Sequence, residues 1–141
     1  GLLHSAKKNN FALSYFDNAK KVRPENLEPI YFKGVYYQKI GENKKAVKTF
    51  KEVIDEDPQN AKAHFKIGIN YYQMDSIEKA YRSFEMAIKT DPQFFEAFYM
   101  KGLTAETLGN IEEAKKYYKQ TLNFDPENKL ASDGLKRIEK L

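Results

Sequence analysis

Apolar residues along this chain recur at intervals of three and four positions, which places them on one face of an α-helix. Phe65, Ile69 and Tyr72 follow this spacing. Short breaks separate such runs from one another, at residues 40–42, 74–76 and 108–110. Gly41 and Gly109 in these breaks suit the positive φ of a tight turn. The pattern is helical rather than alternating, so it predicts an all-α chain made of paired short helices.

Proline gives the sequence a fixed period. Four of the five prolines are each 34 residues apart: Pro24, Pro58, Pro92 and Pro126. An aspartate precedes each of the last three. Because proline cannot continue a helix and disfavours helical geometry in the residue before it, each Asp-Pro should follow the end of a second helix. A period of this length indicates a repeat protein.

Small and large side chains keep the same period. Glycine comes ten residues after a proline, at Gly34, Gly68 and Gly102. Alanine recurs at Ala46, Ala80 and Ala114. A large ring follows each alanine by four residues, at Phe50, Phe84 and Tyr118. Small residues let two helices approach closely, so we expect the rings to fill the space that the small residues leave.

This combination of glycine, alanine, aromatic and Asp-Pro positions resembles the tetratricopeptide repeat family. The resemblance implies an all-α, right-handed superhelical solenoid of antiparallel helix pairs. It implies one domain over 1–141, divided into a partial unit 1–26, full units 27–60, 61–94 and 95–128, and a capping helix 129–141. Since the first unit is incomplete, we expect the chain to be a fragment of a longer protein that continues upstream.

The last thirteen residues should form an amphipathic helix that caps the stack. Its apolar positions are Leu130, Leu135, Ile138 and Leu141. Charged residues such as Arg137 are expected to face water. One repeat cannot bury its apolar face alone, so a terminal helix of this kind completes the core of the last unit.

Some positions depart from the family pattern. The large slot early in each first helix holds Ile30, His64 and Phe98, with no tryptophan. Tyr37 and Tyr71 give way to Ala105 in the third unit. His64 thus occupies a packing position, which favours a core histidine over a metal ligand. None of these departures changes the predicted fold.

Little in the sequence points to catalysis. The chain has no cysteine and two histidines, His4 and His64, with no catalytic motif around either. It contains no glycine-rich phosphate-binding motif. Acidic pairs such as Glu112-Glu113 are expected on solvated helix surfaces. We therefore predict a non-enzymatic protein without catalytic, metal-binding or cofactor-binding residues.

The net charge of +4 comes from 24 basic and 20 acidic residues and does not by itself indicate a polyanion partner. Lysines cluster on predicted second helices, at residues 44–51 and 115–119, but acids are interleaved with them. A solvated outer face is favoured, so we predict no nucleic-acid binding. No apolar run approaches the roughly 18 residues that a membrane helix requires, so we expect no membrane insertion. Cytoplasm and periplasm are both compatible with the sequence.

In tetratricopeptide repeats the first helices line a concave groove that takes a peptide or a partner helix. The resemblance places the following residues there: Tyr31, Val35, Gln38, Lys62, Phe65, Lys66, Ile69, Tyr72, Tyr99, Leu103 and Glu106. Aromatic residues hold the fifth position of each unit and aliphatic residues the ninth. The groove should therefore be apolar and tyrosine-rich, with a charged rim that includes Glu28 and Glu96. Tyrosine suits a partner surface because it offers a large contact area and a hydroxyl group.

Two further expectations concern these groove positions. Some members of the family grip a C-terminal carboxylate with a lysine at the fifth position and an asparagine at the ninth. Neither residue stands at those positions here, so recognition of that type is not expected. The groove aromatics also have a structural alternative, as a ladder of rings that packs the core.

These observations predict a protein–protein interaction or scaffold module whose partner the sequence does not identify. One alternative is a structural role, through self-association or through packing against another domain of the same chain. Another is a regulatory or targeting region of a larger enzyme.

Overall fold

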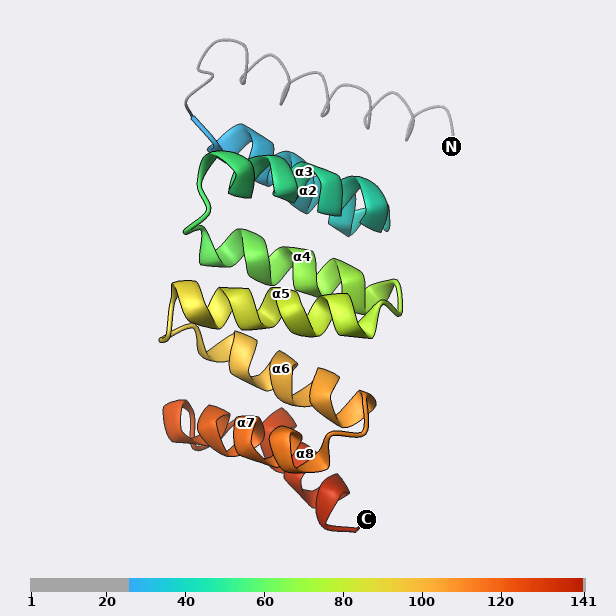
Figure 1. Cartoon of the computed structure of the whole chain (residues 1–141), viewed down its shortest axis with the longest axis vertical. Helices are drawn as coiled ribbons and strands as arrows, with labels where there is room; N and C mark the ends of the chain where they lie inside the picture. Colours follow the sequence, from blue (N-terminus) through green and yellow to red (C-terminus); the bar gives the residue numbers. More distant parts are fainter. Residues whose placement is uncertain (1–25, 141) are drawn as a thin grey trace. The chain divides into compact units, whose positions relative to one another are not determined.

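The computed structural model describes residues 26–140, which form seven α-helices and no β-strand (Figure 1). Their bounds are α2 Glu28–Lys39, α3 Asn43–Glu56, α4 Ala61–Gln73, α5 Ile77–Thr90, α6 Phe95–Thr107, α7 Ile111–Phe124 and α8 Lys129–Glu139. The chain is thus all-α, as the apolar spacing predicted. The predicted partial unit at 1–26 lies, except for its last residue, outside the described residues, as does Leu141.

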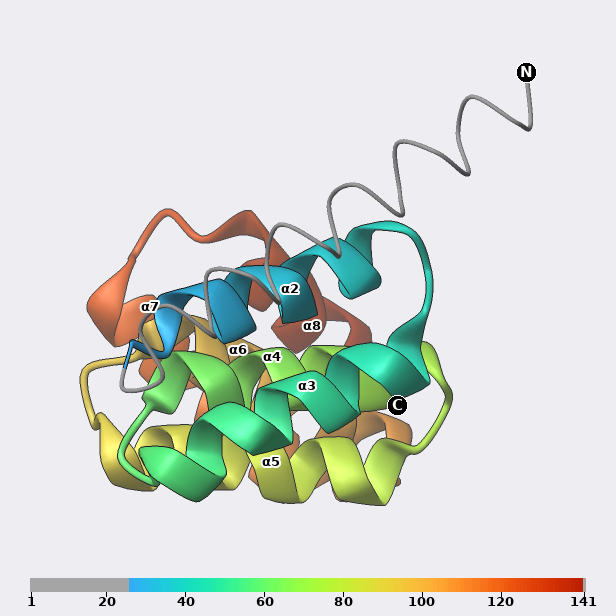
Figure 2. The same ribbon diagram turned by 90° about the horizontal axis from the view of Figure 1, so that it is seen from above.

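The chain divides into two compact units, Gly1–Pro58 and Gln59–Leu141. In the described part of the first unit, α2 packs against α3. In the second unit, each helix from α4 to α7 packs against the helix that follows it, and α8 also contacts α6. Figure 2 shows α4 lying beside α5 within this unit. The second unit therefore stacks its helices in the order of the sequence.

The turns within each pair are tight because one residue adopts a left-handed conformation. Gly41 has a φ of 80° and Gly109 a φ of 85°, as their positions predicted. Asp75 takes the same place in the second pair with a φ of 62°. A side chain at such a φ costs free energy, which aspartate tolerates better than most residues.

Asp-Pro ends the second helix of each pair, as predicted. Extended aspartates follow the last residues of α3, α5 and α7, at Asp57, Asp91 and Asp125. The first helices differ in how they begin. Asn60 and Asn128 each accept a hydrogen bond from a backbone amide of α4 or α8, at 3.0 Å, whereas Phe94 precedes α6 without a side-chain cap.

The core of each pair is a ring packed against a glycine. A Cβ atom on Gly34 would lie 2.7 Å from the Phe50 ring, and one on Gly68 would lie 2.6 Å from the Phe84 ring. Both rings are fully buried. The expectation that rings fill the space left by small residues is confirmed. His64 is also a core residue, with 8% of its surface exposed.

The capping helix α8 completes the core around Tyr118. Ala131, Gly134 and Ile138 are buried, and Leu135 packs partly against the same cluster. The prediction for Leu130 is wrong, since 60% of its surface is exposed. The helix turns Ala131 and Gly134 toward Tyr118, so the neighbouring Leu130 points away.

None of the helices within residues 26–140 combines the length and the apolar composition that a bilayer crossing needs.

Candidate peptide-binding surface

The predicted groove residues lie on the first helices of the pairs. On α2, Tyr31, Val35 and Gln38 are half-buried. On α4 and α6, Lys62 is exposed and the remaining predicted residues are half-buried: Phe65, Lys66, Ile69, Tyr72, Tyr99, Leu103 and Glu106. We call the five apolar or aromatic members of the second unit the inner-helix surface: Phe65, Ile69, Tyr72, Tyr99 and Leu103.

The fifth-position aromatics pack against the buried ring of their own pair. The ring centroids are 5.6 Å apart for Phe65 and Phe84, and 5.7 Å apart for Tyr99 and Tyr118. The first unit repeats this contact, with 5.5 Å between the rings of Tyr31 and Phe50. Each fifth-position ring thus has a structural role, while its half-buried state leaves part of it at the surface.

Tyr99 of α6 lies near Tyr72 of α4. Burial raises the pKa of Tyr99, Arg137 partly opposes this increase, and Tyr72 adds to it. The Tyr99 phenol therefore stays neutral and can donate a hydrogen bond over the whole physiological pH range. The inner-helix surface is accordingly an apolar area that carries hydroxyl groups.

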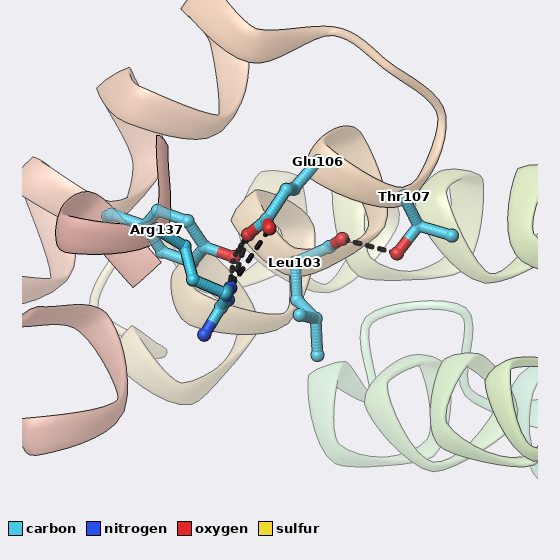
Figure 3. Close-up of polar contacts among 5 residues, drawn as sticks. Leu103, Glu106, Thr107 and Arg137 are labelled. Carbon is cyan, nitrogen blue, oxygen red and sulfur yellow. Dashed lines mark hydrogen bonds and ion pairs between the residues drawn. The ribbon is translucent and has the colours of Figure 1, made fainter. Parts of the chain in front are cut away.

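Glu106 is already engaged by the chain itself (Figure 3). Arg137 of α8 donates to its carboxylate through Nε at 3.0 Å and Nη2 at 2.8 Å. The Tyr118 hydroxyl donates to the same group at 2.6 Å. These hydrogen bonds, from Arg137 first and Tyr118 second, lower the pKa of Glu106 against the opposing effect of burial. An ionised Glu106 thus anchors the capping helix at neutral pH.

Arg137 was expected to face water, and 48% of its side chain is indeed exposed. Its contact with Glu106 spans 31 residues and joins α8 to α6. Charge periodicity along α8 gives no signal for this pair, because the partner lies on another helix.

Lys101 of α6 is a second residue that the sequence analysis missed. It is 5% exposed, and its ammonium group donates to the Tyr117 hydroxyl at 2.8 Å. The ammonium also lies over the rings of Tyr117 and Tyr81, at 4.4 Å and 5.1 Å from their centroids, and 3.8 Å from the Glu85 carboxylate. Because it is enclosed and paired, Lys101 holds α5, α6 and α7 together rather than meeting a ligand.

The outer lysines form two mixed patches. A depression of about 390 Å³ on α7 is lined by Glu112, Lys115, Lys116 and Lys119. Another of about 450 Å³ on α3 is lined by Lys44, Val47, Lys48, Lys51, Glu52 and Asp55. Acids accompany the lysines in both. Within the described part of the chain, no three acidic or histidine side chains gather in a way that could hold a metal ion.

Family comparisons place most of the chain in one repeat family. Models described as "Tetratricopeptide repeat" match residues 62–93 and 95–128, and one described as "TPR repeat" matches residues 34–75. Together they span 34–93 and 95–128. No curated protein matches the sequence significantly.

Several solved structures are similar. The first TPR domain of Spaghetti (RPAP3), bound to the HSP90 peptide SRMEEVD, is 25% identical, with a TM-score of 0.77 over 79% of this chain and 88% of that one. The second TPR domain of human RPAP3, in complex with the HSP70 peptide SGPTIEEVD, is also 25% identical, with a TM-score of 0.77 over 82% and 100%. MamA has the same fold at 21% identity, with a TM-score of 0.87 over 97% and 80%.

Proposed function

Because this chain belongs to the tetratricopeptide repeat family, and is thus a protein-interaction module, we propose that it binds a peptide or helix of a partner protein across the inner-helix surface. The two RPAP3 domains that carry bound peptides support this assignment. Tetratricopeptide repeats are typically non-catalytic protein-interaction modules.

The observation that carries the proposal is the half-exposure of Ile69, Tyr72 and Leu103. These side chains lie outside the buried core and on the first helices of two successive pairs. Because each side chain is already partly buried, covering what remains exposed with a ligand contributes roughly 0.5–1.5 kcal/mol. An amphipathic helix or an extended segment could use several of them at once.

The chemistry of this surface favours an apolar ligand over an acidic chain end. Phe65 and Tyr99 stand at the fifth positions, and Ile69 and Leu103 at the ninth, so no lysine–asparagine pair is available to hold a terminal carboxylate. Glu106 adds negative charge nearby and is neutralised by Arg137 of the same chain. We therefore expect leucine or aromatic anchors in the ligand, with hydrogen bonds to Tyr72 and Tyr99.

The test is selection of binding peptides from a random library displayed on phage, with the whole chain as bait. Affinities of the selected peptides are then measured by fluorescence anisotropy for the wild type and for a Tyr72→Ala, Leu103→Ala double variant. Loss of two anchors should weaken binding by about tenfold or more. The peptide SRMEEVD serves as the acidic comparison, and we expect it to bind more weakly than the selected peptides.

Met86→Ala is the matched control, because Met86 is also apolar and 42% exposed but lies on the second helix α5. It should leave binding unchanged. Circular dichroism checks that all variants keep their helix content. If selected peptides bind the double variant as well as the wild type, the inner-helix surface is not the binding site.

Self-association is the second candidate, and the packing of Phe65 and Tyr99 against core rings is the observation that favours a structural role for this surface. Light scattering over a range of protein concentrations separates the two. A monomer at all concentrations supports peptide binding, whereas dimers that the Tyr72→Ala, Leu103→Ala variant dissolves support self-association.

A further inference from the structure

One junction in the second unit carries two aromatic residues at positions where the other described repeats mostly have small or polar ones, with Leu27 as the exception. Phe95, the first residue of α6, corresponds to Ala61 in α4 and Lys129 in α8. Phe124, the last residue of α7, corresponds to Glu56 and Thr90 at the ends of α3 and α5. Positions that depart from a chain's own repeat pattern without a packing need are candidates for function.

These two aromatics meet in space. α6 begins and α7 ends at the same edge of the second unit, at the left in Figure 1. The rings of Phe95 and Phe124 are stacked, with centroids 6.5 Å apart and planes at 25°. The ring of Phe98, which is 8% exposed, packs against Phe124, with 5.3 Å between the ring centroids. We call Phe95, Phe98 and Phe124 the aromatic edge.

Part of the aromatic edge is exposed to solvent. Phe124 keeps 42% of its surface exposed and Phe95 is half-buried. Polar residues stand at equivalent positions elsewhere, at Glu56, Thr90 and Lys129, so the repeat pattern itself does not require rings here. The exposed part of these rings costs solubility, which is typical of a contact surface.

Three acids and one lysine, Lys129, lie close to the aromatic edge in the sequence. Glu96 follows Phe95 directly, and Asp125 and Glu127 follow Phe124. Among residues 26–140, no lysine or arginine forms an ion pair with these acids. The last turn of α7 contains no basic residue, although the exposed carbonyls of a helix C-terminus favour one.

Elsewhere the chain covers surface aromatics with its own lysines. Lys45 lies over the Tyr37 ring at 5.8 Å from its centroid, and Lys79 over the Tyr71 ring at 5.6 Å. In the part of the chain that the structure describes, neither Phe95 nor Phe124 has such a cation over its ring. The aromatic edge thus leaves part of two rings open to a cation from outside, with three acids next to them in the sequence, of which Asp125 accepts a hydrogen bond from Asn128.

We propose that the aromatic edge docks an arginine- or lysine-bearing segment of a partner protein. The cation stacks on the exposed rings of Phe95 and Phe124, and its N–H groups reach the carboxylates of Glu96, Asp125 or Glu127. Arginine fits best, because its flat guanidinium both stacks on rings and donates to carboxylates. Phe95 lies one helical turn from Tyr99 on α6, so the aromatic edge adjoins the inner-helix surface but shares no residue with it.

The test is nuclear magnetic resonance titration of the whole chain with a short peptide of repeated Arg-Leu-Gly. A peptide of repeated Gln-Leu-Gly, equal in length and without charge, is the control ligand. We expect the arginine peptide to shift the backbone amides of residues 94–96 and 124–127, and we expect the glutamine peptide to leave them in place. Added salt should weaken the binding, because it screens the charge contribution.

The matching variant restores what other repeats carry: Phe95→Ala, as at position 61, with Phe124→Thr, as at position 90. It should remain folded and bind the arginine peptide about tenfold more weakly, since two rings at roughly 0.5–1 kcal/mol each are lost. Met86→Thr removes an equally exposed apolar side chain from α5 and should bind as the wild type does. The Tyr72→Ala, Leu103→Ala variant should also bind normally.

Five results would overturn the proposal. Amide shifts in the wild type that map away from residues 94–96 and 124–127 would place the contact elsewhere, as would equal affinity in the double variant. Unfolding of the double variant would show that the two rings are core residues. Shifts that depend on protein concentration rather than on peptide would mean that the aromatic edge joins two copies of this chain. Loss of binding in the Tyr72→Ala, Leu103→Ala variant alone would assign the peptide to the inner-helix surface instead.

Discussion

Gly68 lies so close to Phe84 that a Cβ atom placed on it would stand 2.6 Å from a ring carbon. Gly102 meets Tyr118 in the same way at 2.9 Å, and Gly134 meets the other side of that ring at 2.7 Å. Real Cβ atoms do not approach rings this closely, so any larger residue must push the helices apart. The absence of a side chain at these positions therefore sets how near the helices can pack.

Gly68→Ala should accordingly destabilise the fold by about 1–3 kcal/mol, because the Phe84 ring is fully buried and cannot move aside. Unfolding in urea measures the change. Phe84→Leu, which makes room, should recover part of this loss when it is combined with Gly68→Ala. Strictly additive effects of the two substitutions would show that the glycine and the ring do not constrain each other.

In the third pair a different contact takes the place of the lysine–tyrosine contact of the first two pairs, and only the tertiary structure shows it. In the first two pairs, Lys45 and Lys79 cover Tyr37 and Tyr71. The third pair has Ala105 and Glu113 at these two positions. Glu113 instead accepts a hydrogen bond from the Tyr81 hydroxyl of the preceding pair, and burial together with this bond raises the Tyr81 pKa. The sequence identified the alanine as a departure but not the contact that replaces the missing ring.

At the scale of elements, the helix ends follow from local chemistry. Asp-Pro and the tight turns stop each helix within a residue or two of the expected position, because proline and positive φ act on the backbone where they stand. The orientation of α8 does not follow so directly. A helix of this amphipathic pattern can rotate by one position, and the close fit of Gly134 against Tyr118 selects the rotation that exposes Leu130.

The ion pair between Arg137 of α8 and Glu106 of α6 should make the stability of the fold depend on pH. Hydrogen bonds from Arg137 and Tyr118 lower the folded-state pKa of Glu106 below its ordinary value of 4.5. A lowered pKa means that the ionised carboxylate stabilises the fold above pH 4.5, and that this contribution is lost as the pH falls through the folded-state pKa. Because Arg137 is half exposed, the contribution should stay below about 1 kcal/mol.

Urea unfolding of the wild type and of Glu106→Gln over a range of pH tests this expectation. The wild type should be the more stable above pH 4.5, and the difference should shrink as the pH falls below that value. Glu139→Gln, at an exposed position on α8, should show no such pH-dependent difference. A difference that persists unchanged in acid would exclude ionised Glu106 as its source.

At the scale of the whole molecule, the second unit depends on the capping helix α8. Its helices stack in sequence order, so Tyr118 of the last pair would lose its cover without α8. Ala131 and Ile138 are buried against the same cluster as Tyr118, and Gly134 fits against its ring. The capping helix is therefore part of the core of this unit.

Deletion of residues 129–141 should lower the melting temperature by several degrees, since it exposes a large buried ring and removes the Arg137–Glu106 pair. Circular dichroism during heating measures this. Leu130→Ser, at a site that is 60% exposed, should leave the melting temperature nearly unchanged. A truncated chain that melts with the wild type would contradict the capping role.

The sequence by itself determined the all-α fold, the paired helices, their ends and the repeat family. These features depend on residue spacing and on local backbone chemistry, which a periodic pattern records directly. It also predicted that the groove positions lie on the first helices, but it did not show what each side chain there contacts.

Only the tertiary structure decided which side chains, at the groove positions and elsewhere, are already engaged. Glu106 is held by a residue 31 positions away, Lys101 is enclosed by rings from two other helices, and Phe95 meets Phe124 across a helix pair. Each of these contacts depends on the distance and rotation between helices. Glycine–ring packing sets that geometry in three dimensions, and the spacing of residues along the chain does not specify it.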